Sequence, residues 1–283
     1  MRPQQWVKNL SLFAALVFSG HLVETHDLLL TVIGFLAFSL LSSSVYIAND
    51  IADVDNDRNH PIKSKRPFPA GLLPVGLAAV AAVVLGAVGL AAGFWLQTQF
   101  GFVLVAYTLL NVFYTLKLKE VVILDVMVIA AGFVLRVAGG ATLIQVPMSE
   151  WLIVCTILLS LFLGFSKRRT ELVMQPDGSG VTRSVLGHYS QHFLDQMIGV
   201  VTATTVMSYA LYTISEETVR KFGTHDLIYT VPFVLYGIFR YLYLVHERTE
   251  GEDPAKTILT DTPLLLTVVL WIAVASWIIY KGH

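Results

Sequence analysis

Residues 49–71 place four acids, followed by a run of bases, directly after a long apolar segment. If the segment continues as a helix, with about 100° of rotation per residue, four oxygen-bearing side chains share one face. These are Asn49, Asp50, Asp53 and Asp57. Such a face suits a hard divalent cation, and Mg²⁺ completes its shell with water and phosphate oxygens. The spacing therefore predicts a Mg²⁺ site that binds a pyrophosphate group.

The bases that follow these acids are Arg58, Lys63, Lys65 and Arg66. They would neutralise phosphate oxygens that a metal leaves uncovered. Two simpler readings stay open at this point. The acids could form a solvated loop end, and bases gather at the cytoplasmic boundary of a membrane whatever their use.

Charged residues also lie inside or at the ends of other apolar segments. Asp125 and Arg136 are 11 residues apart and therefore share a helix face. Charges within a membrane span usually face the bundle interior or a wet cavity. Asp125 is thus a candidate for a second metal or a substrate hydroxyl, and Arg136 for a deep phosphate or a structural pair.

Three consecutive bases, Lys167, Arg168 and Arg169, close a further apolar segment. They cannot all face one way, so at least one is expected to bind anionic headgroups. Glu171 lies four residues after Lys167, which predicts a local ion pair. We find no glycine-rich phosphate loop, no Cys/His metal cluster and no hydrolase nucleophile motif.

The composition is that of a membrane protein. The chain is 55% hydrophobic and 14% charged, whereas soluble domains carry about 25% charged residues. Its net charge of −1 predicts no nucleic-acid partner. Cys155 is the only cysteine, so no disulfide can form within the chain. No cleavable signal pattern is evident at the N-terminus.

Nine apolar segments approach the roughly 20 residues that a membrane span needs. They cover roughly 9–24, 27–49, 72–96, 100–117, 121–143, 150–167, 193–215, 226–246 and 262–281. The first is the weakest because Lys8 and Asn9 cut into it. We therefore expect one domain, residues 1–283, that is an all-α integral membrane protein with nine transmembrane helices.

Loop charge orients this bundle. With the N-terminus in the cytoplasm, the inside segments hold 14 of the 19 Lys and Arg residues and the outside segments hold 3. This asymmetry predicts an N-in, C-out topology. The long charged loops 50–71, 168–192 and 247–261 then lie inside, so we expect the active site at the cytoplasmic face. The last of these loops ends in the segment Asp253–Pro263, whose sequence favours a helix cap over a lid.

These motifs resemble those of the UbiA superfamily of intramembrane prenyltransferases over nearly the whole chain. The core of the likeness is Asn49-Asp50-x-x-Asp53-x-x-x-Asp57, then Lys65-Arg66-Pro67 and Gly71. The sequence is most similar to the decaprenyl-phosphate phosphoribosyltransferase branch. The features that favour this branch are Arg2-Pro-x-Gln-Trp-x-Lys-Asn9, Leu118-Lys119…Leu124-Asp125, Gly132-Phe-Val-Leu-Arg136, Ser166-Lys-Arg-Arg-Thr-Glu-Leu172 and Asp253-Pro…Thr260-Asp-x-Pro263.

The resemblance implies a helical bundle around a central cavity that opens sideways to the lipid bilayer, in the cytoplasmic (inner) membrane. It implies Mg²⁺, 5-phosphoribosyl-1-diphosphate as donor and a polyprenyl (decaprenyl-type) phosphate as acceptor, in arabinan-type cell-envelope glycan synthesis, and it allows a homo-oligomer. The catalytic residues would be Asp50, Asp53, Asp57 and Asp125. The substrate-binding residues would be Lys8, Arg66, Tyr114, Lys119, Arg136, Lys167, Arg168, Arg169, Glu171 and Tyr189.

Two other functions remain open from the sequence. An aromatic prenyltransferase would use the same Mg²⁺ site to ionise a polyprenyl diphosphate. The second aspartate motif of such enzymes is not intact here, because position 129, four residues after Asp125, is Ile. A transporter or channel would also have buried charges and glycine-rich helices.

Overall fold

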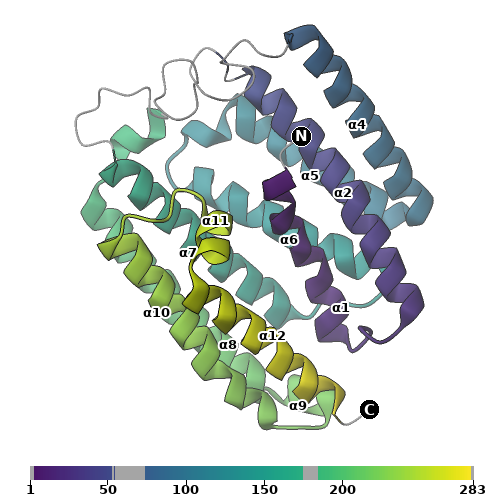
Figure 1. The fold of residues 1–283 in the computed structure, drawn as a ribbon, viewed down its shortest axis with the longest axis vertical. Coiled ribbons are helices and arrows are strands. Elements are labelled where there is room, and N and C mark those ends of the chain that lie inside the picture. The colour runs from purple at the N-terminus through teal and green to yellow at the C-terminus, as the bar shows by residue number, and fades with distance from the viewer. Residues whose placement is uncertain (1–2, 53, 55–73, 175–183, 282–283) are drawn as a thin grey trace.

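The computed structural model describes residues 3–52, 54, 74–174 and 184–281 (Figure 1). Every regular element in these ranges is helical. In chain order they are η1 (Pro3–Leu12), α1 (Phe13–Ser19), α2 (Thr25–Ala52), α4 (Val75–Leu96), α5 (Thr98–Leu116), η3 (Leu118–Glu120), α6 (Leu124–Leu143), α7 (Glu150–Val173), η4 (Ser184–His188), α8 (Gln191–Ile214), α9 (Glu216–Phe222), η5 (Asp226–Thr230), α10 (Val231–Glu247), α11 (Pro254–Thr260) and α12 (Thr262–Tyr280).

Eight helices in the described ranges are long and apolar enough to cross a membrane. They are α2, α4, α5, α6, α7, α8, η5 with α10, and α12, and they match the second to ninth predicted spans. The prediction of an all-α, multi-pass membrane protein is therefore confirmed.

The count of nine spans is not confirmed, because the first predicted span, 9–24, is not one long α-helix. Residues Pro3–Leu12 form a 3₁₀ helix, and the seven-residue α1 follows and ends at Gly20, whose φ is +89°. A 3₁₀ helix rises about 2.0 Å per residue, so η1 and α1 together still extend roughly 30 Å. Figure 1 shows this segment running lengthwise between α2 and α6. Whether it crosses the membrane stays a prediction.

The interior has two main groups of buried side chains. One joins η1, α2, α5 and α6 through residues such as Leu12, Phe38 and Leu104. The other joins α7, α8 and α10 through residues such as Phe162 and Leu244. The two halves of the chain, purple to teal and green to yellow in Figure 1, thus lie side by side, each with its own core.

Two predicted helix ends were wrong. Helix α7 continues to Val173, so residues 168–173 are helical and do not belong to the predicted loop 168–192. Arg168 and Arg169 are 0% and 6% exposed, and carboxylates lie beside them, which allows a charged sequence to stay inside the bundle. Helix α6 begins at Leu124 instead of 121, because η3 and a turn at Ile123 precede it.

Candidate functional site

The last turn of α2 carries the first two residues of the predicted metal site. Asn49 and Asp50 are both half-buried. The Oδ1 atom of Asn49 accepts a hydrogen bond of 2.5 Å from Oγ1 of Thr115, at the end of α5. Asp53 and Asp57 lie outside the described residues, as do the bases Arg58, Lys63, Lys65 and Arg66. Their roles therefore remain predictions.

A buried ion pair lies at the same end of the bundle, where α7 ends and α6 begins. Nε of Arg168 donates to Oδ2 of Asp125 at 2.5 Å, and both side chains are fully buried. Nη1 of Arg168 donates to Oε2 of Glu171 at 2.5 Å, and Nη2 donates to the hydroxyl of Tyr114 at 3.3 Å. The charge of Arg168 is therefore matched by two carboxylates of the protein itself.

Tyr189 completes the surroundings of Asp125. Its hydroxyl donates to Oδ1 of Asp125 at 2.7 Å and accepts from the backbone N–H of Ile123 at 2.6 Å. Ile123 has a φ of +70°, which is costly for a β-branched residue. Burial and the neighbouring Asp125 raise the pKa of Tyr189, so its phenol stays protonated and keeps donating. Both oxygens of Asp125 thus contact protein groups and the side chain is fully buried, so a direct contact with substrate would require neighbouring groups to move.

The end of α5 links the two groups. Thr115 contacts Asn49 of α2, and the adjacent Tyr114 contacts Arg168 of α7. Two neighbouring residues of α5 thus contact the predicted metal site and the buried ion pair. The predicted site residues Asn49, Tyr114, Asp125, Arg168, Glu171 and Tyr189 are brought together by these contacts.

The predicted ion pair between Lys167 and Glu171 is confirmed, with 3.8 Å between Nζ and Oε1. Glu171 is nevertheless closer to Arg168, so Lys167 is the weaker partner. Lys8 and Lys119 are half-buried. The structure leaves their predicted role in binding substrate untested.

Arg169 lies away from this cluster and joins three helices. It donates to Oδ1 of Asp195 on α8 at 2.5 Å and to the carbonyl oxygen of Val245 on α10 at 3.3 Å. Nε2 of His246 lies 3.3 Å from the same oxygen of Asp195. These contacts suit a structural role for Arg169, and its predicted role in binding substrate stays a prediction.

Arg136 is buried deep in the bundle among neutral groups. Its Nε, Nη1 and Nη2 atoms donate to the side chain of Asn9, the carbonyl of Gly132 and the hydroxyl of Tyr107, each at 2.9 Å. The aromatic rings of Phe38, Tyr107 and Phe133 lie within 5.5 Å of its guanidinium carbon. Of the two predicted roles, this geometry favours the structural one.

Sequence reasoning did not find the partners Thr115, Asn9 and Asp195. For Asn9 a signal existed, because an amide inside an apolar segment needs a hydrogen-bonding partner at depth. Asp195 lies 26 residues from Arg169, and no spacing pattern in the sequence links the two. No local signal identified Thr115, whose partner is 66 residues away.

An apolar cavity of about 450 Å³ lies between α1, α6, α7, α8, α9, α10 and α12. Its lining includes Phe133, Leu152, Tyr209, Ile238 and Trp271. A cavity of this size is within the range of sites that bind small molecules. Its lining suits a hydrocarbon chain.

The fold has solved counterparts. A UbiA homologue from Archaeoglobus fulgidus bound to GPP and Mg²⁺ superposes with a TM-score of 0.72 at 19% identity, covering 98% of this chain and 97% of that one. An apo UbiA homologue from Aeropyrum pernix superposes with a TM-score of 0.67 at 14% identity, covering 97% of this chain and 98% of that one. These similarities establish a UbiA-like fold.

Sequence comparison finds relatives that match nearly the whole chain. Decaprenyl-phosphate phosphoribosyltransferase of Mycolicibacterium smegmatis is 30% identical over 99% of this chain and 91% of its own length. The enzyme of the same name from Mycobacterium tuberculosis is 31% identical over 96% of this chain and 90% of its own length. The model of the UbiA prenyltransferase family matches residues 10–260. With its fold, its acidic helix end and this match in agreement, the chain belongs to the UbiA prenyltransferase family.

Proposed function

We propose that this protein transfers the 5-phosphoribosyl group of 5-phosphoribosyl-1-diphosphate to a polyprenyl phosphate of the decaprenyl type and releases pyrophosphate. The observation that carries the proposal is the end-to-end similarity to decaprenyl-phosphate phosphoribosyltransferases from three genera. The product would serve the synthesis of arabinan-type cell-envelope glycans. The protein would lie in the cytoplasmic membrane, with its N-terminus and active site on the cytoplasmic side.

Mg²⁺ would be held by Asn49, Asp50, Asp53 and Asp57. The two described members of this set, Asn49 and Asp50, offer amide and carboxylate oxygens at a half-buried helix end, and such hard donors fit this ion. When bound, the ion would neutralise charge that develops on the leaving pyrophosphate.

The reaction breaks the bond between C1 of the ribose and the diphosphate oxygen, and the electron pair leaves with pyrophosphate. An oxygen of the lipid phosphate forms the new bond to C1. This nucleophile is already anionic at neutral pH, so no strong general base is required.

The charged residues divide into two groups under this proposal. Lys8, Arg66, Lys119 and Lys167 supply positive charge to the two phosphate-bearing substrates. Arg168 is already neutralised by Asp125 and Glu171, so we assign it a positioning role together with Tyr189. It fixes Tyr114, and hence the end of α5 beside Asn49.

The apolar chain of the acceptor would occupy the cavity next to α7 and α12. The surrounding apolar helices would also exclude water from the donor and so limit hydrolysis. The donor would thus enter from the water and the acceptor from the lipid bilayer.

The test offers purified protein two donor and acceptor pairs. One is 5-phosphoribosyl-1-diphosphate with decaprenyl phosphate, and the other is a polyprenyl diphosphate with an aromatic acid. We expect Mg²⁺-dependent pyrophosphate release, with a ribosylated lipid product, from the first pair only. Product from the second pair alone would reject the proposal in favour of an aromatic prenyltransferase.

A matched pair of variants tests the metal assignment. Asp50→Asn should lower turnover by roughly 100-fold or more, because stabilisation of the leaving group is lost. Asp226→Asn removes an exposed carboxylate that precedes α10, and it should leave turnover unchanged. Equal turnover by Asp50→Asn and the wild type would contradict the assignment.

A further inference from the structure

A second group of metal-ligating side chains lies where α1 connects to α2. It consists of His21, Glu24 and Asp27, with His26 beside Asp27. The start and the end of the 28-residue α2 are roughly 40 Å apart. The group is therefore remote from the acidic helix end that carries the proposed activity. The sequence search for Cys/His clusters missed it, because only one of its three ligands is an imidazole.

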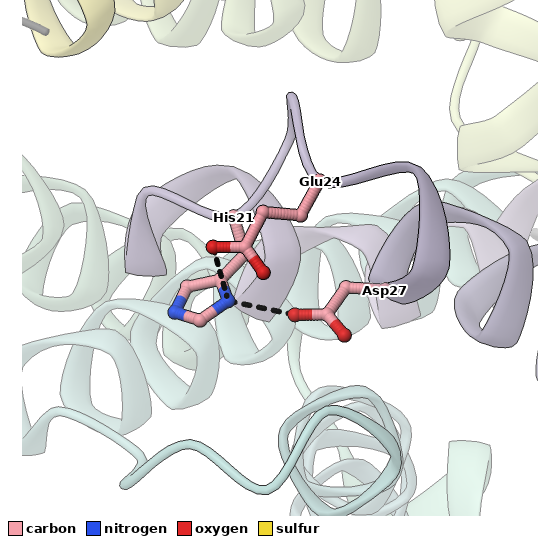
Figure 2. A group of neighbouring side chains, drawn as sticks. All are labelled: His21, Glu24 and Asp27. Carbon is pink, nitrogen blue, oxygen red and sulfur yellow. Dashed lines mark hydrogen bonds and ion pairs between the residues drawn. The ribbon is translucent and has the colours of Figure 1, made fainter.

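The three side chains point toward a common centre (Figure 2). Nδ1 of His21 lies 2.7 Å from Oδ2 of Asp27 and 3.4 Å from Oε1 of Glu24. One potential ligand atom from each of the three residues lies within 4.8 Å of the other two. Nδ1 of His26 is 3.2 Å from the second oxygen of Asp27 and so orients that carboxylate.

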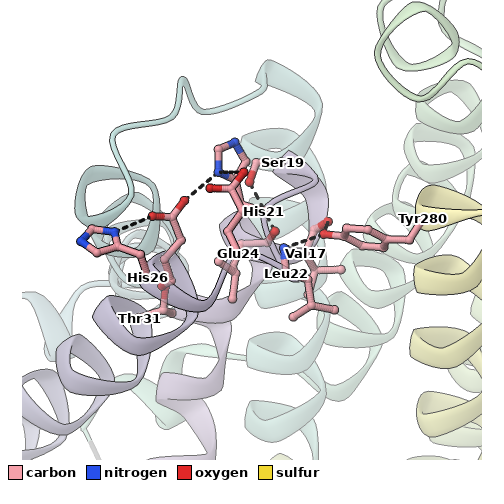
Figure 3. Close-up of polar contacts among 10 residues, drawn as sticks. Val17, Ser19, His21, Leu22, Glu24, His26, Thr31 and Tyr280 are labelled. Carbon is pink, nitrogen blue, oxygen red and sulfur yellow. Dashed lines mark hydrogen bonds and ion pairs between the residues drawn. The ribbon is translucent and has the colours of Figure 1, made fainter. Parts of the chain in front are cut away.

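The backbone around these side chains is fixed. Gly20 turns the chain with a φ of +89°, and the N–H of His21 then donates to the carbonyl of Leu16. The N–H of Leu22 donates to the hydroxyl of Tyr280 at the end of α12, as Figure 3 shows. These hydrogen bonds position His21 in the connection before α2. Asp27 lies in the first turn of α2.

The charge in this group is unbalanced. Asp27 is only 9% exposed, and among the described residues its ion-pair partners are the two imidazoles. Glu24 adds a second negative charge, and His21 is again its ion-pair partner. A nearly buried carboxylate with a like-charged neighbour needs a cation, which can be a proton on an imidazole or a metal ion.

We propose that His21, Glu24 and Asp27 form a binding site for a divalent transition metal of the Zn²⁺ class. An imidazole nitrogen with two carboxylate oxygens is a ligand set that Zn²⁺ accepts, whereas Mg²⁺ prefers oxygen alone. The metal takes the place of the proton on Nδ1 of His21, and a water fills the fourth position. The side chain of Glu24 is 56% exposed and provides the route of entry.

Metal at this position would join the end of α1 to the start of α2. Tyr280 ties the same connection to the last helix, with hydrogen bonds to Leu22 and Val17. The site would therefore stabilise the contact between the two ends of the chain. This role is independent of the proposed transfer reaction.

The test uses full-length protein in detergent, without a polyhistidine tag, stripped with a chelator. After equilibration with Zn²⁺ and desalting, we expect about one Zn²⁺ per chain by mass spectrometry. Zn²⁺ should also raise the midpoint of thermal unfolding, and equimolar Mg²⁺ should not.

Three variants make the result specific. Glu24→Gln alters an exposed side chain and His21→Asn removes the imidazole, and both should lose the bound Zn²⁺ and the shift in midpoint. His225→Ala removes an exposed imidazole after α9 and should keep both. Glu24→Gln needs to match the wild-type midpoint without metal, so that lost binding is not a folding defect.

Two outcomes would overturn the proposal. In one, Zn²⁺ binding is the same in both site variants as in the wild type. In the other, no Zn²⁺ binds to the wild-type protein. Neither outcome bears on the transfer reaction.

Discussion

Arg168 illustrates how a residue that suits phosphate binding can serve the protein instead. Three of its N–H groups donate to Asp125, Glu171 and Tyr114, and its side chain is fully buried. A phosphate would have to displace a carboxylate from a fully buried site. The ion pair therefore acts as a rigid support for the end of α5, at a desolvation cost that the hydrogen bonds offset.

The first prediction concerns this support. Arg168→Met leaves Asp125 buried and unpaired, which should destabilise the protein by about 3–5 kcal/mol. Adding Asp125→Asn removes that charge and should restore part of the loss, because the two changes are coupled. Thermal unfolding in detergent measures both effects.

Lys167→Met is the matched control, since it removes a partly exposed cation 3.8 Å from Glu171 on the same helix. It should cost no more than about 1 kcal/mol. If Arg168→Met were no more damaging than this control, the buried pair would contribute little to stability.

The second prediction concerns the hydroxyl of Thr115, which holds Asn49. Thr115→Val should weaken apparent Mg²⁺ affinity in the transfer assay by roughly fivefold, the equivalent of one hydrogen bond of about 1 kcal/mol. Thr108 lies two turns before Thr115 on α5, and its hydroxyl donates to the backbone carbonyl of Leu104. Thr108→Val should therefore leave the Mg²⁺ dependence unchanged. An unchanged Mg²⁺ dependence in both variants would argue against a role for Asn49 at the metal.

At the scale of elements, helices marked by hydropathy could be predicted from the sequence, and features that depend on contacts with other helices could not. Val75–Leu96 could be predicted because it is apolar without interruption and contains no charge. The end of α7 could not, because Arg168 and Arg169 are paired with carboxylates on other helices, which lets charged residues continue the helix inside the bundle. The His21 group could not be predicted either, since its ligands converge through a turn that composition does not specify.

The third prediction concerns the junction of α11 and α12. Asp261 caps α12 by accepting from the N–H of Leu264, and Arg240 donates to both of its oxygens. Asp253 caps α11 in the same way, which confirms the predicted cap. Arg240 lowers the pKa of Asp261 below its ordinary value of 3.8.

Because the folded pKa is the lower one, the stabilisation from ionised Asp261 is complete above the ordinary value and is lost as the pH falls through the folded pKa. Asp261→Asn keeps the cap and removes the charge. The wild type should therefore have the higher melting midpoint at pH 7, and the difference should shrink below about pH 4. A difference that is constant down to pH 3 would contradict this account.

The fourth prediction tests how closely η1 packs on α6. A Cβ atom at Gly140 would lie 2.0 Å from the carbonyl oxygen of Leu12, which is backbone and cannot turn away. Gly140→Ala should therefore lower the free energy of unfolding by at least about 1–3 kcal/mol. Gly76→Ala on α4 meets nothing within 4 Å and should be neutral or slightly stabilising. Equal stability of the two variants would show that η1 lies farther from α6.

At the scale of the molecule, hydropathy and loop charge predicted the fold class and a bundle of apolar helices. They did not predict the form of the N-terminal segment, because its polar residue Asn9 is compensated by Ser39, Ser42 and Arg136 from other helices. The number of crossings, and with it the relation between the two termini, depends on this segment.

The fifth prediction addresses that topology with single cysteines in a Cys155→Ser background. Val23 lies in the α1–α2 connection and is 74% exposed, and Glu120 is exposed in η3, at the opposite end of α5 from α4. In intact cells, a membrane-impermeant maleimide should label Val23→Cys, and should label Glu120→Cys only after permeabilisation. The reverse labelling pattern would show that the protein has the opposite orientation in the membrane.

An epitope tag placed before η1 distinguishes eight membrane crossings from nine. If η1 and α1 cross the membrane, the tag is protected in intact cells while position 23 is labelled, and the protein has nine crossings. If the tag and position 23 are accessible from the same side, only the eight long helices cross. The buried Asn9–Arg136 contact favours the first result, because it places η1 at the depth of the membrane-spanning α6.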